Sequence, residues 1–125
     1  MNNFKELKIW QKGMESVKEI YNLTKQFPEE EKFILRSQMV RAAISIPSNI
    51  AEGTSPKSKK DFARFLEISL GSCFELETQL LITQWNYQPI TINVSDLIKM
   101  IQEEQKMINS FIKRLTSKEL LETSN

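Results

Sequence analysis

The chain has 125 residues, of which 40% are hydrophobic and 26% are charged, and its formal net charge is +1. This length predicts a single domain, residues 1–125, whose core is large enough to fold without disulfides or metal ions. Three glycines and four prolines are too few for a β-protein rich in tight turns. The absence of histidine removes the most common general base and metal ligand.

Targeting and redox features point to the cytoplasm. Cys73 is the single cysteine, which excludes an intrachain disulfide and fits a reducing compartment. The first residues lack a signal-peptide pattern, and no apolar run approaches the ~20 residues that cross a bilayer. We therefore expect a cytoplasmic protein that is not an enzyme, with no catalytic residue, cofactor, metal, membrane partner or small-molecule substrate.

Residues 5–27 predict the first helix. Its apolar side chains recur three and four residues apart and are expected to form one core stripe: Leu7, Trp10, Met14, Val17, Tyr21 and Thr24, widened by Ile20 and Phe27. Pro28 and the acidic residues 29–31 mark the break that follows.

Residues 31–52 predict the second helix, with Gly53 as its C-terminal cap and a kink at Pro47. One face is apolar and should enter the core: Leu35, Met39, Ala42, Ala43, Ile46 and Ile50. Val40, Ile44 and Ala51 extend the apolar arc to about 200°, well beyond the stripe that one core needs. In a chain this short, we expect another subunit to cover the excess.

Residues 58–86 and 95–121 predict the third and fourth helices, joined by a loop at 87–93. The third opens with a capping-box pattern, Ser58 to Asp61. Their expected core stripes are Phe62, Leu66, Ser69, Cys73, Leu76 and Leu80, then Leu97, Ile101, Ile108, Phe111, Ile112 and Leu115. Four amphipathic helices with short connections predict an all-α, up-down-up-down antiparallel four-helix bundle. The alternative is a pair of helical hairpins that swaps between chains.

Three segments carry a family resemblance: residues 41–53 (RAAISIPSNIAEG), 4–12 (FKELKIWQK) and 70–80 (LGSCFELETQL). With them, nearly the whole chain resembles the bacterial four-helix bundle family, also called the 23S rRNA intervening-sequence protein or S23 ribosomal protein family. That family is similar to the accessory variability protein of diversity-generating retroelements. The resemblance implies a ring-like homo-oligomer, expected to be a pentamer, with a loose link to RNA, and it implies no catalytic residues.

A basic cluster surrounds the start of the third helix: Lys57, Lys59, Lys60 and Arg64. Lys60 and Arg64 lie one turn apart and share a face, so the cluster is the candidate nucleic-acid site. A ring of subunits would repeat it and raise its avidity. The alternative interpretation is a solvated helix start without a ligand.

A polar stripe on the second helix comprises Arg41, Ser45, Ser48 and Glu52. We favour a structural role, pairing across a helix or subunit interface, over a ligand or RNA contact. Glu77 and Glu104 are predicted as buried carboxylates because they adjoin apolar stripes. We favour pairing with Arg36 or Arg41 over a carboxylate metal site.

Aromatic side chains that stack on nucleic-acid bases are a further candidate set: Trp10, Tyr21, Phe62 and Phe65. The spacing of the first three favours the core. The leading hypothesis is a non-enzymatic oligomer that associates with RNA or a nucleoprotein through basic patches. The alternatives are a protein-interaction scaffold without nucleic acid and an enzyme that uses Glu52, Glu77 or Glu104.

Overall fold

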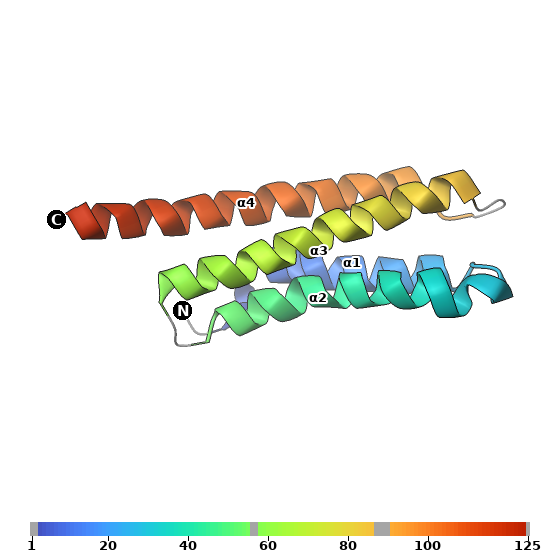
Figure 1. Cartoon of the computed structure of the whole chain (residues 1–125), viewed down its shortest axis with the longest axis horizontal. Helices are drawn as coiled ribbons and strands as arrows, with labels where there is room; N and C mark the ends of the chain where they lie inside the picture. The colour runs from blue at the N-terminus through green and yellow to red at the C-terminus, as the bar shows by residue number, and fades with distance from the viewer. Residues whose placement is uncertain (1–2, 56–57, 87–90, 125) are drawn as a thin grey trace.

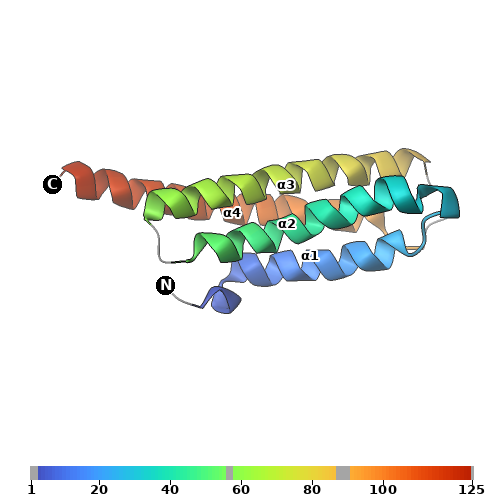
Figure 2. The ribbon, with the colours of Figure 1, turned by 60° about the horizontal axis from the view of Figure 1, so that its bottom comes forward.

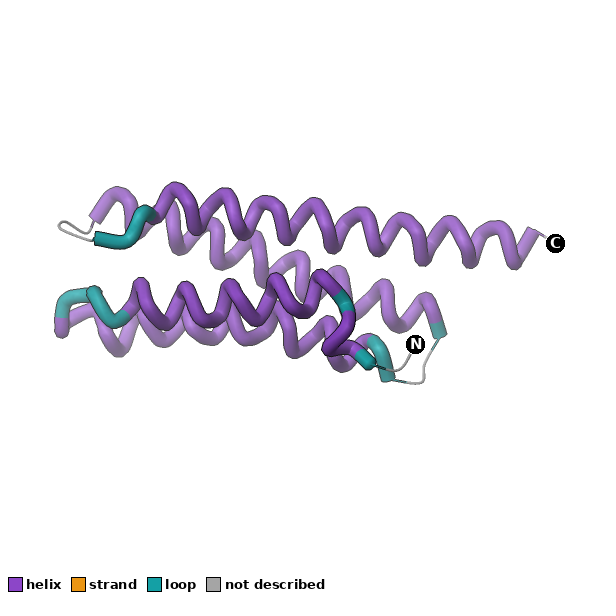
Figure 3. Tube along the Cα trace, turned by 180° about the vertical axis from the view of Figure 1, so that it is seen from behind, coloured by secondary structure: helices purple, strands orange, loops and turns teal. Residues whose placement is uncertain are grey.

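The computed structural model describes residues 3–55, 58–86 and 91–124. These residues form four α-helices and no strand: α1 (Lys8–Thr24), α2 (Ser37–Gly53), α3 (Lys59–Asn86) and α4 (Val94–Ser124) (Figures 1 and 3). A 3-10 turn, η1 (Phe4–Glu6), precedes α1. A second 3-10 turn, η2 (Glu29–Glu31), and a π-helical turn, η3 (Lys32–Arg36), precede α2.

The helix boundaries differ from those predicted mainly because of these short turns. Leu7 has an extended backbone and separates η1 from α1, and α1 ends at Thr24 rather than at 27. The second helix is regular only from Ser37, although it was predicted from 31, and it continues through Pro47. The fourth helix continues to Ser124 rather than stopping near 121.

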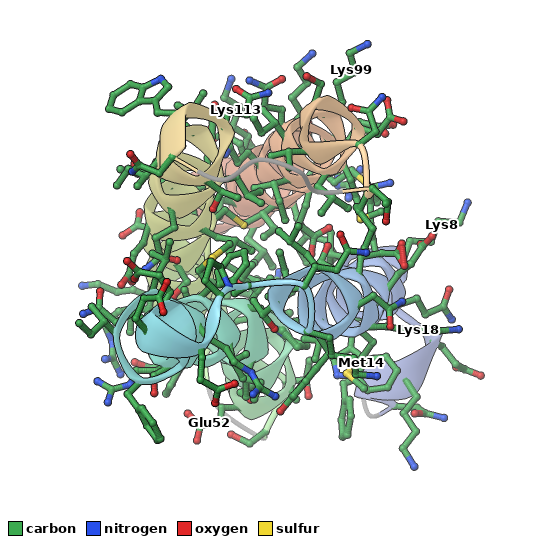
Figure 4. All side chains as sticks on the ribbon, turned by 90° about the vertical axis from the view of Figure 1, so that its right-hand side faces the viewer. Lys8, Met14, Lys18, Glu52, Lys99 and Lys113 are labelled. Carbon is green, nitrogen blue, oxygen red and sulfur yellow. The ribbon has the colours of Figure 1, made fainter. Side chains whose placement is uncertain are left out.

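Successive helices run in opposite directions, so the chain forms the predicted up-down-up-down bundle (Figures 1 and 2). Each helix contacts its neighbour in the chain, and α1 also contacts α4, which closes the bundle within one chain. Seen from one end, the four helices occupy the corners of a quadrilateral (Figure 4). The last part of α4 projects beyond the start of α3 (Figure 2). In the described residues, no helix is apolar over a length that would cross a membrane.

Local hydrogen bonds fix the starts of α3 and α4. The Ser58 hydroxyl accepts the N–H of Asp61 at 3.1 Å and donates to the Asp61 carboxylate at 3.3 Å, so Ser58 caps α3, which is the first half of the predicted capping box. Asn93 Oδ1 accepts the N–H of Asp96 at 3.3 Å and caps α4. The connections beside the start of α4 are also joined, because the Gln26 amide exchanges two hydrogen bonds with Thr91, at 2.8 and 2.9 Å.

The core contains nearly all of the stripes predicted for α2, α3 and α4. Fully or almost fully buried side chains are Met39, Ala42, Ala43, Ile46, Ile50, Phe62, Leu66, Ser69, Cys73, Leu76, Leu80, Leu97, Ile101, Ile108 and Ile112. Leu35, Phe111 and Leu115 pack against this cluster at its margin. The Ser69 hydroxyl is satisfied inside the core because it donates to the carbonyl of Ile46 at 2.9 Å.

The stripe predicted for the first helix was confirmed only in part: Ile20, Thr24 and Phe27 are buried, and Leu7, Trp10 and Val17 pack at the margin of the core. The buried face of α1 consists of Ile9, Gly13, Ser16, Ile20, Leu23 and Thr24. Met14 and Tyr21 are 44% and 38% exposed instead. The reason is close packing: a Cβ on Gly13 would meet Ile46 Cγ2 and Pro47 Cβ at 3.4 Å. Small residues allow α2 to pack closely against this face. Because Gly and Ser are not hydrophobic, the spacing of hydrophobic residues does not identify them as part of the core.

Candidate nucleic-acid interface

The predicted basic cluster lies at the N-terminus of α3. Lys60 and Arg64 are exposed and one turn apart, and Lys59 is half-buried. Lys57 lies outside the described residues. The capping box at Ser58 starts α3 and thereby places these cations on its first two turns. The exposed part of the cluster is therefore a small basic surface at a helix N-terminus, where backbone dipoles also favour anions.

Arg64 is held by two neighbours on its own helix. Its guanidinium lies 3.8 Å from the Asp61 carboxylate and 5.1 Å from the centre of the Phe65 ring. The negative charge of Asp61 partly offsets the positive potential of the basic cluster at the start of α3. The ring contact orients the guanidinium along the surface of α3.

A second group of cations was missed by the sequence reasoning. Lys99, Lys106 and Lys113 are exposed and follow one another at seven-residue intervals along α4, and Arg114 is exposed beside them. Figure 4 labels Lys99 and Lys113 on α4 and Lys8 on α1, with Lys8 and Lys99 reaching outward. The seven-residue spacing was the available signal, because it places residues on one face of a helix.

A groove lies between the start of α1 and the C-terminal half of α4. Its volume is about 450 Å³, and its lining combines apolar with basic side chains: Leu7, Lys8, Lys106, Met107, Phe111 and Arg114. The Arg114 guanidinium lies 5.2 Å from the centre of the Phe111 ring. This groove brings together residues about one hundred positions apart in the chain, so only the fold reveals it.

The polar stripe of α2 divides between a helix seam and the surface. Ser45 lies on the seam with α3, where its hydroxyl oxygen is 2.8 Å from that of Ser72 and accepts from the Asn49 amide at 2.9 Å. Arg41, Ser48 and Glu52 are exposed. The seam supports the favoured structural role for Ser45.

Glu104 is completely buried in the middle of the bundle. Neither of its carboxylate oxygens has a hydrogen-bond partner, and Oε2 lies 3.2 Å from where a Cβ on Gly13 would be. Burial raises the pKa of this carboxyl to about 8, although the Lys12 ammonium acts in the opposite direction. Glu104 therefore holds a proton at neutral pH.

The predicted pairing of the two carboxylates with Arg36 or Arg41 was wrong. Glu77 is only half-buried and accepts from the amides of Gln102 and Gln105, at 2.9 and 2.7 Å, across the seam between α3 and α4. Glu104 stays buried because its carboxyl is protonated and neutral, and not because it forms an ion pair with an arginine. Arg41 is exposed because its stripe lies outside the core.

Neither metal binding nor a reactive thiol finds support around these carboxylates. Among the described residues, no group of three or more Cys, Asp or Glu side chains is arranged to hold a metal ion. Cys73 is buried in the core, and desolvation together with the charges of Glu104 and Glu77 raises the pKa of its thiol far above the ordinary value. A thiol of this kind packs as a small apolar group.

Most of the aromatic residues that were candidates for stacking on nucleic-acid bases contact other side chains of the same chain instead. Phe62 is buried and packs against Phe111 with the ring centres 5.3 Å apart, and Trp10 packs edge-on against Phe4 at the same distance. Phe65 is half-buried beside Arg64. Tyr21 is the most exposed of the four candidates, at 38%.

Exposed apolar side chains lie on the predicted second helix and also on α3, where none was predicted. Because α2 packs between α1 and α3, Val40 and Ala51 are half-buried, whereas Ile44 is exposed. Before α2, Phe33 and Ile34 of η3 are 87% and 64% exposed. On α3, Phe74, Leu81 and Trp85 are 52%, 39% and 77% exposed. With Thr78 they are spaced four, three and four residues apart, so they form a second apolar stripe opposite the core; we call these four residues the outer stripe.

Comparison with known proteins places the chain among proteins of one family. The family model described as 23S rRNA-intervening sequence protein matches residues 5–110. A crystal structure of a protein of unknown function from the S23 ribosomal protein family of Bacteroides thetaiotaomicron is similar, with 28% sequence identity and a TM-score of 0.75. The match covers 84% of this chain and 95% of that one. No curated protein matches the chain.

Proposed function

The chain belongs to the 23S rRNA-intervening sequence protein family, and from this membership we propose that it is a non-enzymatic homo-oligomer that associates with RNA or a nucleoprotein. The association uses basic surfaces of the bundle, and the assembly is a cytoplasmic ring, expected to have five subunits. The solved relative has no known function, so the proposal depends on the surfaces of this chain.

The observation that carries the RNA association is the basic start of α3. Lys60 and Arg64 are exposed on adjacent turns at a helix N-terminus, in a chain whose net charge is only +1. Exposed Lys and Arg side chains at such a position suit phosphate oxygens. One patch alone would bind weakly, so repetition in an oligomer is part of the proposal.

The outer stripe of α3 supports self-association. An amphipathic helix needs one apolar stripe to join its own core, and α3 has a second one that faces away from it. Exposed aromatic and aliphatic side chains in a row are typical of contacts between subunits. A second copy of the chain is the proposed partner of this stripe.

The RNA association is tested by replacing Lys59, Lys60 and Arg64 together with alanine. Fluorescence anisotropy with a labelled RNA at about 50 and 200 mM salt should show salt-sensitive binding by the natural protein. It should show weaker binding with a shallower salt dependence for the variant, because each lost phosphate contact removes roughly 0.7 to 0.9 from the logarithmic slope. The matched control replaces Lys5, Lys18 and Lys25, which are exposed and belong to neither group of cations. Equal binding by both triple variants would exclude the patch.

Self-association is tested by sedimentation with and without RNA. The natural protein should sediment as an oligomer at micromolar concentration. A variant with Phe74, Leu81 and Trp85 changed to serine should shift toward the monomer while keeping its helical circular dichroism, since these side chains lie outside the core. A natural protein that remains monomeric in both conditions contradicts the assembly.

The second candidate function is a protein-interaction scaffold that does not bind nucleic acid. The outer stripe of α3 also favours this reading, because a different protein would bury it equally well. A protein partner that is captured equally well by the natural chain and by the basic-patch variant, after nuclease treatment, would favour the scaffold.

A further inference from the structure

We propose that the groove between α1 and α4 binds an unpaired nucleotide of single-stranded RNA, with phosphate contacts from Lys8 and Lys106 and a base stacked on Arg114. This inference rests on the proposed function, because it names the kind of RNA that the protein takes and a second surface that contacts it.

The size and lining of the groove suit one nucleotide. Its volume of about 450 Å³ falls within the range of small-ligand sites, about 300 to 1,000 Å³. Leu7 and Met107 supply an apolar wall, and both are only half-buried, so part of this wall faces solvent. A groove that is apolar inside and basic at its rim resembles in kind the surfaces that hold one base and its phosphate.

The charge of the groove favours an anion. Lys8, Lys106 and Arg114 are basic and exposed, and Glu6 is the acidic residue among those that line it. The local balance of about +2 exceeds the net charge of +1 for the whole chain. Phosphate is the anion that the proposed RNA partner would bring.

Arg114 provides a flat surface for a base. Its guanidinium lies 5.2 Å from the centre of the Phe111 ring, and that ring packs against Phe62 with the centres 5.3 Å apart. Phe62 is buried and belongs to the core, so the stack is supported from inside the bundle. Arginine held in this way stacks on bases and keeps its charge for a phosphate.

This chemistry selects single strands over duplexes. In a duplex the bases are stacked on one another, so a duplex would meet the groove only with its phosphates. An unpaired base adds stacking on Arg114 and contact with the apolar wall, and both strengthen the binding of a single strand. We expect single-stranded RNA to bind about tenfold more tightly than a duplex of the same length.

The test compares two double charge reversals on the same helix. The groove variant is Lys106→Glu with Arg114→Glu, and the matched control is Lys99→Glu with Lys113→Glu, whose residues are exposed on α4 but do not line the groove. Binding of a labelled uridine decamer and of a ten-base-pair RNA duplex is measured by fluorescence anisotropy. Circular dichroism checks that both variants are folded.

The expected result is that the groove variant loses about tenfold in affinity for the decamer relative to the control, and that the preference for single strands disappears. A decamer containing 4-thiouridine should also crosslink to the tryptic peptide of residues 107–113, which contains Met107 and Phe111. Equal affinities of the two variants, or an acidic peptide that competes as well as the decamer, would overturn the proposal. RNA binding would then still stand if the natural protein binds the decamer, whereas no binding at all would overturn the proposed function itself.

Discussion

Replacing Glu104 with glutamine should remove a large pH dependence from the stability of the bundle. The carboxyl is completely buried, and neither oxygen has a hydrogen-bond partner. The Lys12 ammonium from α1 acts on this carboxyl, Oε2 lies 3.2 Å from where a Cβ on Gly13 would be, and the charge of Glu104 acts in turn on Cys73 of α3. Since no neighbour compensates fully for lost hydration, ionisation of Glu104 disfavours the folded state.

The direction and size of the effect follow from the two pKa values of Glu104. Its ordinary pKa is 4.5 and its pKa in the folded chain is about 8. Between these values the folded chain binds a proton that the unfolded chain has released. The stability due to the protonated carboxyl is therefore complete below pH 4.5 and is lost as the pH rises toward 8. The loss is about 1.4 kcal/mol for each pH unit, or about 4 kcal/mol between pH 5 and pH 9.

Urea unfolding followed by circular dichroism at several pH values measures this effect. The free energy of unfolding of the natural protein should fall relative to that of the glutamine variant as the pH rises, because every other titrating group is common to both. Glu103→Gln is the matched control: its side chain is 67% exposed and lies 3.5 Å from Lys12, and it should leave the pH dependence in place. A difference between the natural and Glu104→Gln proteins that stays constant from pH 5 to 9 would refute the reasoning.

The other predictions concern packing and are checked by the same unfolding measurements. Gly53→Ala should lower the free energy of unfolding by about 1 to 3 kcal/mol, because its Cβ would lie 2.7 Å from Cδ1 of Phe62. Gly71→Ala should instead raise it by about 0.5 to 1 kcal/mol, since nothing lies within 4 Å and alanine favours a helix; a loss there would contradict the open position. Leu76→Ala should lower the free energy of unfolding by about 2 to 5 kcal/mol, whereas Ile68→Ala, at a side chain of the same helix that is 45% exposed and lies outside the outer stripe, should change it far less.

The sequence predicted α2, α3 and α4 well because their core stripes consist of large apolar residues at helical spacing. It predicted the buried face of α1 only in part, because beside Ile20 and Thr24 this face also contains the small residues Gly13 and Ser16. Such residues enter a core when two backbones approach closely, and closeness is a property of the pair of helices. The role of Gly53 illustrates the same limit. It was predicted as a cap, but it is the last residue of α2 and leaves room for the ring of Phe62.

The candidate site was predictable only in part. The basic start of α3 is local in sequence, so Lys60 and Arg64 were found. The groove needs α1 and α4 side by side, which no sequence spacing encodes. The burial of Glu104 was predicted from its apolar neighbours in the sequence. The predicted arginine partner is absent, because protonation neutralises the buried carboxyl instead. The wide apolar arc of α2 packs mostly against α1 and α3 of the same chain, and Ile44 remains 41% exposed.

The proton on Glu104 also alters the electrical balance of the whole molecule. The formal charge of +1 counts this residue as an anion. With Glu104 neutral, the folded chain carries about +2 at pH 7 and returns toward +1 as the pH passes 8. In an assembly of several copies this increment is multiplied. The electrophoretic mobility of the native particle should therefore decline across mildly alkaline pH, although the chain has no imidazole to titrate.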